Sequence, residues 1–305
     1  MNKEVISDKQ GISIISLFII GSSIVLTVAG KAKKDVWIAI IFSILTALPI
    51  VWVHARLLVL FPGRDLYDVL ELVFGKFIGR GISLLFIGFS FFLGGLVLRV
   101  FGDFISTVSS VAIPGIVPML FMGALCIWAV KEGIETIGRW AEFFLIGTIV
   151  LILIVNLLLI NKMNINNLRP ILYEGIKPVV DGAFHAFIFP FTQTIVFTTF
   201  FSSLKNKSVY KVYIVGLLIG GFIKVCMCLL STCNGIAKIF GFNDYRFIVT
   251  PIGLLIINLS YFIHDNVMEK AAFASDIYPS YAFPFQVILP ISILIVAEIK
   301  KKQLT

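Results

Sequence analysis

The stretches GISIISLFIIGSSIVLTVAG (11–30) and PVVDGAFHAFIFPFTQTIVFTTFFSSL (178–204) decide the fold, because both are apolar and both are interrupted by residues that disfavour a helix. Gly21–Ser23 interrupt the first stretch. Pro190 interrupts the second, since proline has no amide to bond back to residue 186. In lipid, backbone groups freed by a break are tolerated only where protein or a water-filled cavity satisfies them. Together the two breaks predict the wall of a binding site.

The composition predicts an all-α polytopic membrane protein. The chain has 305 residues, of which 59% are hydrophobic and 14% charged, and its mean hydropathy is +1.02. A soluble core cannot hide so much apolar surface. Eight stretches without charge are each about long enough for a membrane span: 11–30, 36–55, 81–98, 104–130, 143–161, 182–204, 247–264 and 277–297. The net charge of +8 therefore indicates loops that orient these helices, and no nucleic-acid partner is expected.

No catalytic, metal or cofactor motif stands out. The three histidines lie in different segments, the cysteine spacing matches no zinc site, and neither a phosphate-binding glycine loop nor a nucleophile elbow is present. The sequence therefore predicts neither an enzyme nor a metal site. Asp181, His185 and Lys224 lie at or near membrane depth, where ionisable groups are rare and often functional. They form a candidate ion or proton relay, although a purely structural role for each is equally open.

The breaks predict a site for a small polar or zwitterionic solute. A helix that restarts exposes free amides and the positive end of its dipole, which suits a carboxylate. Hydroxyls could cap both restarts, the amide and hydroxyl groups after Pro190 could bind a solute, and two phenylalanines would add an apolar wall. The alternative is that these residues are ordinary kinks. The predicted ligand-binding residues are Gly21, Ser22, Ser23, Phe189, Pro190, Phe191, Thr192, Gln193 and Thr194.

Short motifs along the whole chain resemble the endospore germination permeases, the B subunits of germinant receptors. They are FPGRDL (61–66), FGK (74–76), RVFGDF (99–104), GIETIGRWAE (133–142), FPF (189–191), GFNDYR (241–246) and YAFPF (281–285). The resemblance implies an amino acid, polyamine and organocation transporter fold of the LeuT type, with two inverted five-helix repeats whose first helices are broken. It also implies nutrient sensing, for amino acids or sugars, together with A-type and C-type partner subunits in the spore inner membrane.

Against this family, the chain forms one membrane domain (1–305) with a first repeat over 8–161 and an incomplete second repeat over 178–299. The family usually has Gly and Glu after its Phe-Pro-Phe run, whereas Thr192 and Gln193 stand here. The chain is also shorter than members of the family. Gly220 and Gly221 resemble the middle of one family helix, and the residues that follow them directly resemble the middle of the next helix. We therefore expect a fused segment over 211–240.

Charge counting favours a fused segment that re-enters the membrane. With the N-terminus cytoplasmic, a full span over 212–237 would place 12 basic residues inside and 12 outside, whereas a re-entrant segment would place 16 inside and 8 outside. The positive-inside rule favours the second arrangement, with eight full spans and a turn at Gly220 and Gly221. A continuous helix remains the alternative. In either case the chain is an integral protein of the spore inner membrane or the bacterial cytoplasmic membrane.

The sequence therefore favours a transporter-like subunit that binds a small nutrient and signals germination without catalysis. Two alternatives remain open. One is a secondary amino-acid transporter coupled to protons through Asp181 or His185. The other is a shortened, inactive paralogue.

Overall fold

The computed structural model describes residues 5–25, 28–109, 114–159, 170–204, 209–219, 224–263 and 272–304. Regular structure in these ranges is helical, apart from an isolated β-bridge between Ile6 and Leu204. Five helical runs in them are long and apolar enough to cross a membrane: Gly30–Leu60, Lys76–Thr107, Ile134–Leu159, Lys177–Thr199 and Tyr278–Lys301. The chain is thus an all-α polytopic membrane protein, as the sequence predicts.

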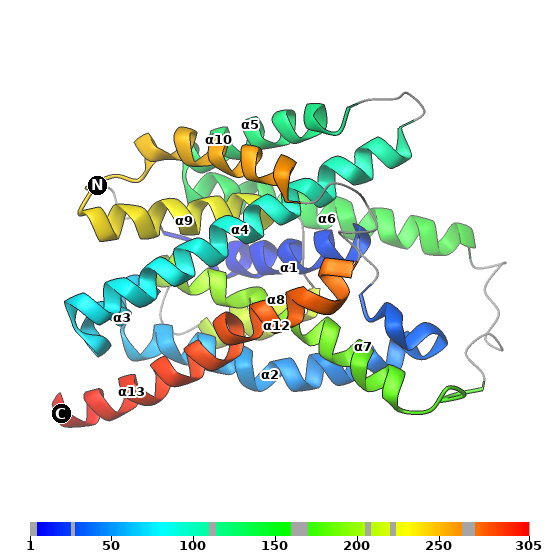
Figure 1. Cartoon of the computed structure of the whole chain (residues 1–305), viewed down its shortest axis with the longest axis horizontal. Coiled ribbons are helices and arrows are strands. Elements are labelled where there is room, and N and C mark those ends of the chain that lie inside the picture. Colours follow the sequence, from blue (N-terminus) through cyan, green and yellow to red (C-terminus); the bar gives the residue numbers. More distant parts are fainter. Residues whose placement is uncertain are drawn as a thin grey trace.

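The helices run roughly along the long axis of the molecule (Figure 1). In chain order they are α1 (Asp8–Val25), η1 (Gly30–Asp35), α2 (Val36–Leu60), α3 (Leu66–Phe74), α4 (Lys76–Val108), α5 (Ile116–Glu132), α6 (Ile134–Leu159), α7 (Lys177–Ile188), η4 (Phe191–Thr199), η5 (Phe201–Ser203), α8 (Val209–Ile219), α9 (Lys224–Phe240), α10 (Arg246–Phe262), η6 (Phe273–Ile277), α12 (Tyr278–Phe283), η7 (Pro284–Ile288) and α13 (Leu289–Leu304). The elements η1, η4 and η5 are 3₁₀ helices, whereas η6 and η7 are π-helical turns.

The boundaries correct one predicted span. The charge-free stretch 104–130 is not one helix, because α4 continues to Val108 and α5 starts at Ile116. The side chains of Arg99 and Asp103 permit this continuation, since they form an ion pair of 3.1 Å within α4 and neutralise each other. With 17 or 18 residues each, α1, α5 and α10 lie at the lower limit for a membrane span.

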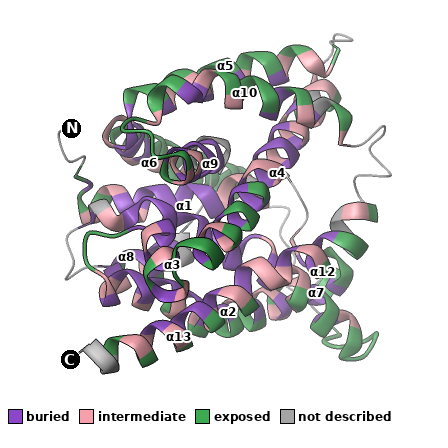
Figure 2. Ribbon diagram, turned by 60° about the vertical axis from the view of Figure 1, so that its left-hand side comes forward, coloured by how far each residue is buried: buried purple, intermediate pink, exposed green. Residues whose placement is uncertain are grey.

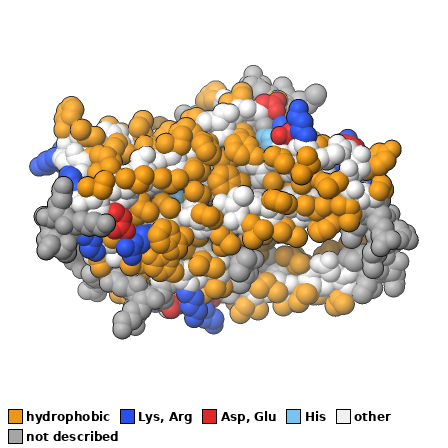
Figure 3. Space-filling model, turned by 90° about the horizontal axis from the view of Figure 1, so that it is seen from below, with side chains coloured by type: hydrophobic (Ala, Val, Ile, Leu, Met, Phe, Trp, Pro, Cys, Tyr) orange, Lys and Arg blue, Asp and Glu red, His pale blue; other side chains and the backbone are white. Residues whose placement is uncertain are grey.

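The two ends of the bundle are identified by their ion pairs. At the first, which we call the α3 end, Lys238 Nζ lies 2.6 Å from Asp68 Oδ1, and Lys301 Nζ donates to the carbonyl of Leu60 at 2.9 Å. At the opposite end, the η1 end, Lys31 pairs with Asp276 at 3.5 Å. Apolar side chains cover most of the face in Figure 3, as expected for a surface in contact with lipid.

The segments α8 and α9 support the re-entrant arrangement. A Cβ atom on Gly11 would meet Val212, and one on Gly216 would meet Ile15, so α8 starts at the same end as α1 and runs parallel to it. The helix α9 ends at the α3 end, where Lys238 binds Asp68. With 11 and 17 residues, the two helices enter from and return to the same end. The predicted turn at Gly220 and Gly221 and the side chain of Lys224 lie outside the described residues.

The helix α1 lies at the centre of the bundle and α5 and α10 lie on its outside (Figure 2), while all residues of η4 are buried. Of the five long apolar runs, α6 is the least covered by protein. Its buried residues, Ile134, Ile137, Gly138 and Ala141, all lie in its first turns, and none of residues 142–159 is buried. The half of α6 toward the η1 end therefore has little protein cover among the described residues.

Candidate functional site

The break at Pro190 is present in the structure. The helix α7 ends at Ile188, the peptide bond between Phe189 and Pro190 is cis, and the chain continues as the 3₁₀ helix η4. All nine residues of η4 are buried. A proline ring supplies no amide for an α-helical bond to residue 186, which is the reason the sequence predicted a break here.

The predicted break at Gly21–Ser23 is wrong, because α1 is a continuous helix from Asp8 to Val25. Glycine and serine keep their backbone amides, so a helix can pass through them at a cost of about 1 kcal/mol or less per residue. The hydroxyl of Ser23 donates to the carbonyl of Ile19 at 2.8 Å, which satisfies it within the helix. A break would instead have freed several backbone groups at membrane depth.

The first residues of η4 join a buried polar cluster with the last helical run. The hydroxyl of Thr192 lies 2.6 Å from Gln286 Oε1 and 3.0 Å from the carbonyl of Phe187, and its proton can serve one of them at a time. The amide of Gln286 donates to the Tyr278 hydroxyl at 3.2 Å, and the amide of Gln193 donates to the same hydroxyl. The two glutamines thus converge on the Tyr278 hydroxyl, and Thr192 joins the cluster through Gln286.

Gln193 is the one member of this cluster with a spare polar atom. Its side chain is fully buried, yet its Oε1 has no hydrogen-bond partner in the part of the chain that the structure describes. A buried polar atom without a partner is costly and suits a site that receives a water molecule or a ligand.

His54, on α2, contacts both sides of the cluster. Its Nε2 lies 3.2 Å from the carbonyl of Gln286, and its Nδ1 lies 3.1 Å from Thr194 Oγ1. Since a carbonyl only accepts, Nε2 carries a proton. In the neutral ring Nδ1 can then accept from the Thr194 hydroxyl, whose one proton can serve either Nδ1 or the carbonyl of Phe191 at 3.2 Å. The imidazole therefore connects η4 to η7.

The partners from the last helical run lie next to irregular turns. Tyr278 follows the π-helical turn η6, and Gln286 lies within η7. Such turns are rare and occur often at functional sites, because they redirect side chains out of the regular helical pattern. His54, Tyr278 and Gln286 were not among the predicted site residues. Each is a polar side chain within an apolar run, but their contacts join positions far apart in the sequence.

Aromatic rings pack beside the polar cluster. The ring of Phe189 packs edge-on to Tyr278 with 6.0 Å between centroids, and Phe191 is 6% exposed. The contact between α1 and η4 includes Phe18 and Phe197, whose centroids are 4.8 Å apart. The role of Gly21, Ser22 and Ser23 as ligand contacts stays a prediction, now as the side of a helix rather than its start.

The other end of η4 is tied to α3. Asn234 Nδ2 donates to the carbonyl of Thr199 at 2.7 Å and lies 3.3 Å from Asp65 Oδ2. Asp65 also caps α3, since its Oδ1 accepts from the amide of Asp68 at 3.0 Å. Burial, with a smaller contribution from the charge of Asp68, raises the pKa of Asp65 to about 6. A chain of hydrogen bonds thus runs from η4 to the α3 end.

Of the candidate relay residues, Asp181 and His185 form no hydrogen bond with the polar cluster in the described part of the chain, and the side chain of Lys224 lies outside the described residues. Asp181 is exposed on α7, and His185 is partly buried one turn later. His185 lies near the Lys31 and Asp276 pair of the η1 end. A relay through these residues stays a prediction.

Comparison with known proteins identifies relatives along the whole chain. A family model described as spore germination protein matches residues 5–219. Spore germination protein KB of Bacillus subtilis is 26% identical over 365 aligned positions, which cover 99% of this chain and 97% of that protein. Spore germination proteins YndE and A2 of the same organism are each 26% identical, over 60% and 57% of this chain and 51% and 48% of their own lengths. No solved structure matches.

The comparison also shows that this chain is shorter than protein KB. The alignment with protein KB has 365 positions and this chain 305 residues, so at least 60 aligned positions have no counterpart here. The family match stops at residue 219, directly before the predicted junction at Gly220. Since the family model covers more than two thirds of the chain, the chain belongs to the spore germination permease family.

Proposed function

We propose that this chain is a membrane subunit of a spore germinant receptor that binds a small nutrient, an amino acid or a sugar. Its ligand would bind at the η4 site, defined as Thr192, Gln193 and Thr194 together with His54, Tyr278 and Gln286. The observation that carries this proposal is the unpartnered Oε1 of the fully buried Gln193. Membership of the germination permease family supports the role in germination.

The chemistry of the site favours a ligand without net charge. The hydrogen-bonding groups of the η4 site are hydroxyls, amides and an imidazole. Because no carboxylate or ammonium of this cluster would balance a net charge, burying a charged solute there would be costly. A sugar hydroxyl or the ammonium of a zwitterion could donate to Gln193 Oε1 and satisfy it.

Ligand binding would be transmitted through the shape of η4. A 3₁₀ helix of nine residues is longer than most, and its hydrogen-bond geometry is poorer than that of an α-helix. A ligand that prefers one winding of η4 would shift the balance between two arrangements. The bonds from Thr199 through Asn234 to Asp65 would carry that change to the α3 end. There, A-type and C-type subunits would sense it.

We also propose two inverted repeats, over 8–161 and 178–299, with the second incomplete in the fused segment 211–240. In this arrangement α1 and α7–η4 are equivalent elements. The missing part of the second repeat accounts for the uncovered half of α6. The proton-coupled transporter is less favoured, because Asp181 and His185 take no part in the polar cluster.

The experiment is a binding screen of radiolabelled amino acids and sugars against the purified full chain, alone and with its A-type and C-type subunits. Thr192→Val and Thr198→Val form a matched pair, since both threonines are fully buried in η4 but only Thr192 contacts Gln286. We expect at least about tenfold weaker binding for Thr192→Val and little change for Thr198→Val, since a lost buried hydrogen bond costs about 1–3 kcal/mol. Equal affinities for the two variants would refute the site.

A further inference from the structure

A cavity of about 380 Å³ lies at the η1 end, between residues 32–35 and residues 170–178. We call it the η1 pocket. Its volume is within the range of small-molecule sites in proteins. It lies at the far end of α7 from the η4 site, because α7 runs from the pocket wall at Pro178 to the break at Pro190.

The backbone around the η1 pocket is held in unfavourable conformations. Ala29, Lys33 and Leu172 have φ angles of 59°, 47° and 56°, and they are the non-glycine residues with positive φ in the part of the chain that the structure describes. Lys33 combines this φ with a ψ of −116°, a region that glycine populates readily and lysine does not. Such residues are strained, and they cluster at ligand sites.

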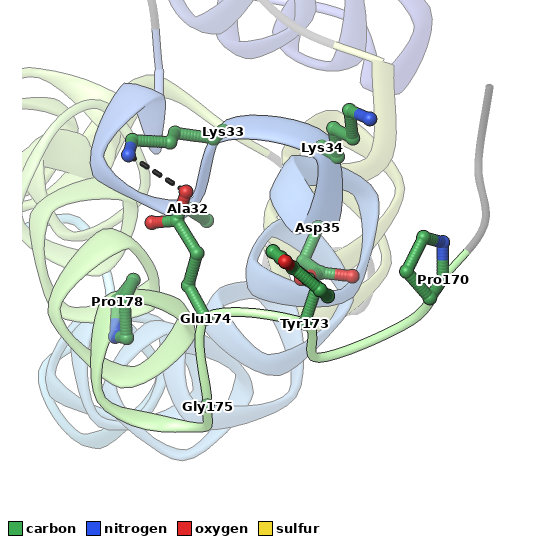
Figure 4. Close-up of a pocket in the computed structure, with 9 residues that line it drawn as sticks. All are labelled: Ala32, Lys33, Lys34, Asp35, Pro170, Tyr173, Glu174, Gly175 and Pro178. Atoms are coloured by element: carbon green, nitrogen blue, oxygen red, sulfur yellow. Dashed lines mark hydrogen bonds and ion pairs between the residues drawn. The ribbon is translucent and has the colours of Figure 1, made fainter.

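Two contacts hold the walls of the pocket together and leave one cation free. Lys33 Nζ pairs with Glu174 Oε1 at 2.8 Å, and the amide of Leu172 donates to the carboxylate of Asp35 at 3.1 and 3.2 Å. Lys34 lines the same pocket, and its ammonium has no hydrogen bond or ion pair among the described residues. Figure 4 shows Lys34 on the side of Asp35 and Tyr173, apart from the Lys33–Glu174 pair.

The remaining walls are flat and apolar. Tyr173 is 82% exposed although it lines the pocket, and Pro170 and Pro178 line it as well. Rings of this kind pack against a planar apolar body. The carboxylates of Asp35 and Glu174 would repel a dianion, so the free ammonium of Lys34 suits a single negative charge.

We propose that the η1 pocket is a second binding site, for a small organic monocarboxylate with a planar apolar body. The carboxylate would pair with Lys34, and the body would stack on Tyr173. The site is separate from the η4 site and does not depend on the function proposed above.

Packing connects this pocket to α7. A Cβ atom on Gly182 would lie 3.0 Å from both the carbonyl oxygen of Ala29 and the Cβ of Ala32. The backbone of η1 therefore rests directly on α7. A ligand that shifts η1 would move the helix that ends at Pro190, so the pocket could modulate the η4 site.

The test is ¹⁹F NMR of 4-fluorophenylacetate with the purified full chain in nanodiscs. We expect saturable line broadening, about fivefold weaker binding for Lys34→Gln and about tenfold weaker binding for Tyr173→Ala. Lys34→Arg should retain binding, and so should Lys131→Gln, which removes an exposed lysine at the end of α5. Gln193→Met should also leave the signal unchanged, which separates this site from the η4 site.

The uncharged compound 2-(4-fluorophenyl)ethanol controls for partition into lipid. Non-saturable broadening, or equal broadening by the alcohol and the carboxylate, would overturn the proposal. Unchanged affinity in both Lys34→Gln and Tyr173→Ala would overturn it too. Thermal unfolding of each variant verifies its fold, and the exposure of Lys34 and Tyr173 makes both substitutions compatible with folding.

Discussion

The stretches 11–30 and 178–204 are both apolar, both carry helix-disfavouring residues near the middle, and only the second is broken there. The difference is the chemistry of the interruption. Residues 21–23 of α1 keep all their amides, and the helix passes through them, whereas Pro190 has none and the chain changes to a 3₁₀ helix. Inside a membrane, a missing backbone hydrogen-bond donor therefore disrupts a helix more than residues of low helix propensity do.

The broken segment is also the one with polar partners. Thr192, Gln193 and Thr194 contact side chains of α2, α12 and η7, whereas Ser23 bonds within its own helix. A 3₁₀ helix presents its side chains every third residue, so they point to different neighbours than those of an α-helix would. The four predictions below test this contrast.

The largest effect is expected for His54→Leu. It removes the partner of Thr194 and of the Gln286 carbonyl, so we expect the free energy of unfolding to fall by about 2–3 kcal/mol. Thermal and denaturant unfolding of the detergent-solubilised chain measures this. Ser23→Ala, the control on α1, should change stability by less than about 0.5 kcal/mol. Similar losses in the two variants would mean that η4 is no more dependent on polar contacts than α1.

Gly182→Val tests the packing of the first half of the broken segment. The added atoms would collide with the η1 backbone at Ala29 and Ala32, and we expect a loss of about 1–3 kcal/mol. Gly147→Val on α6 is the matched control, because a Cβ atom there meets nothing within 4 Å. If the two variants unfold at the same temperature, α7 does not rest on η1 as described.

The raised pKa of Asp65, at the α3 end of the hydrogen-bond chain from η4, predicts that the stability of the protein depends on pH. This pKa rises from 3.8 to about 6 on folding, so between these values the folded chain holds a proton that the unfolded chain has lost. The free energy of unfolding should therefore fall as pH rises from about 4 to 6. The shift in pKa already includes the opposing charge of Lys238, and it corresponds to roughly 1–3 kcal/mol. Unfolding measured across this range should show a flatter profile for Asp65→Asn, and an identical profile would refute the assignment.

Gly21→Ala should have the smallest effect. In a continuous helix, alanine is favoured over glycine, and we expect a gain of up to about 1 kcal/mol in the free energy of unfolding. A broken helix would instead lose stability, because alanine does not replace the freedom of a glycine hinge. The melting temperature of the purified variant distinguishes the two, and a clear decrease would restore the break in α1.

Much of the fold could be predicted from the sequence, because its signals are local. The apolar stretches gave the class of protein, the missing amide of Pro190 gave the second break, and the distribution of lysines favoured the re-entrant α8–α9 pair. Two local signals led to wrong predictions. Glycine and serine at 21–23 do not break α1, and the absence of charge between 104 and 130 hid a helix boundary.

Half of the polar cluster could not be predicted, because its members are far apart in sequence. His54 meets Thr194 across 140 residues, and Thr192 meets Gln286 across 94. No periodicity links such positions. Gln286 also lies in a π-helical turn, which shifts the helical register and so escapes a reading based on a period of 3.6 residues.

The central claim is that the nutrient binds at η4 and depends on Gln193. The most direct test is equilibrium binding of the nutrient found in the screen to the wild-type chain, Gln193→Met and Thr198→Val. Methionine keeps the volume but removes the unpartnered oxygen, so we predict at least about tenfold weaker binding for Gln193→Met and little change for Thr198→Val, whose hydroxyl bonds within η4. Unchanged binding by Gln193→Met, or an equal loss in Thr198→Val, would contradict the account.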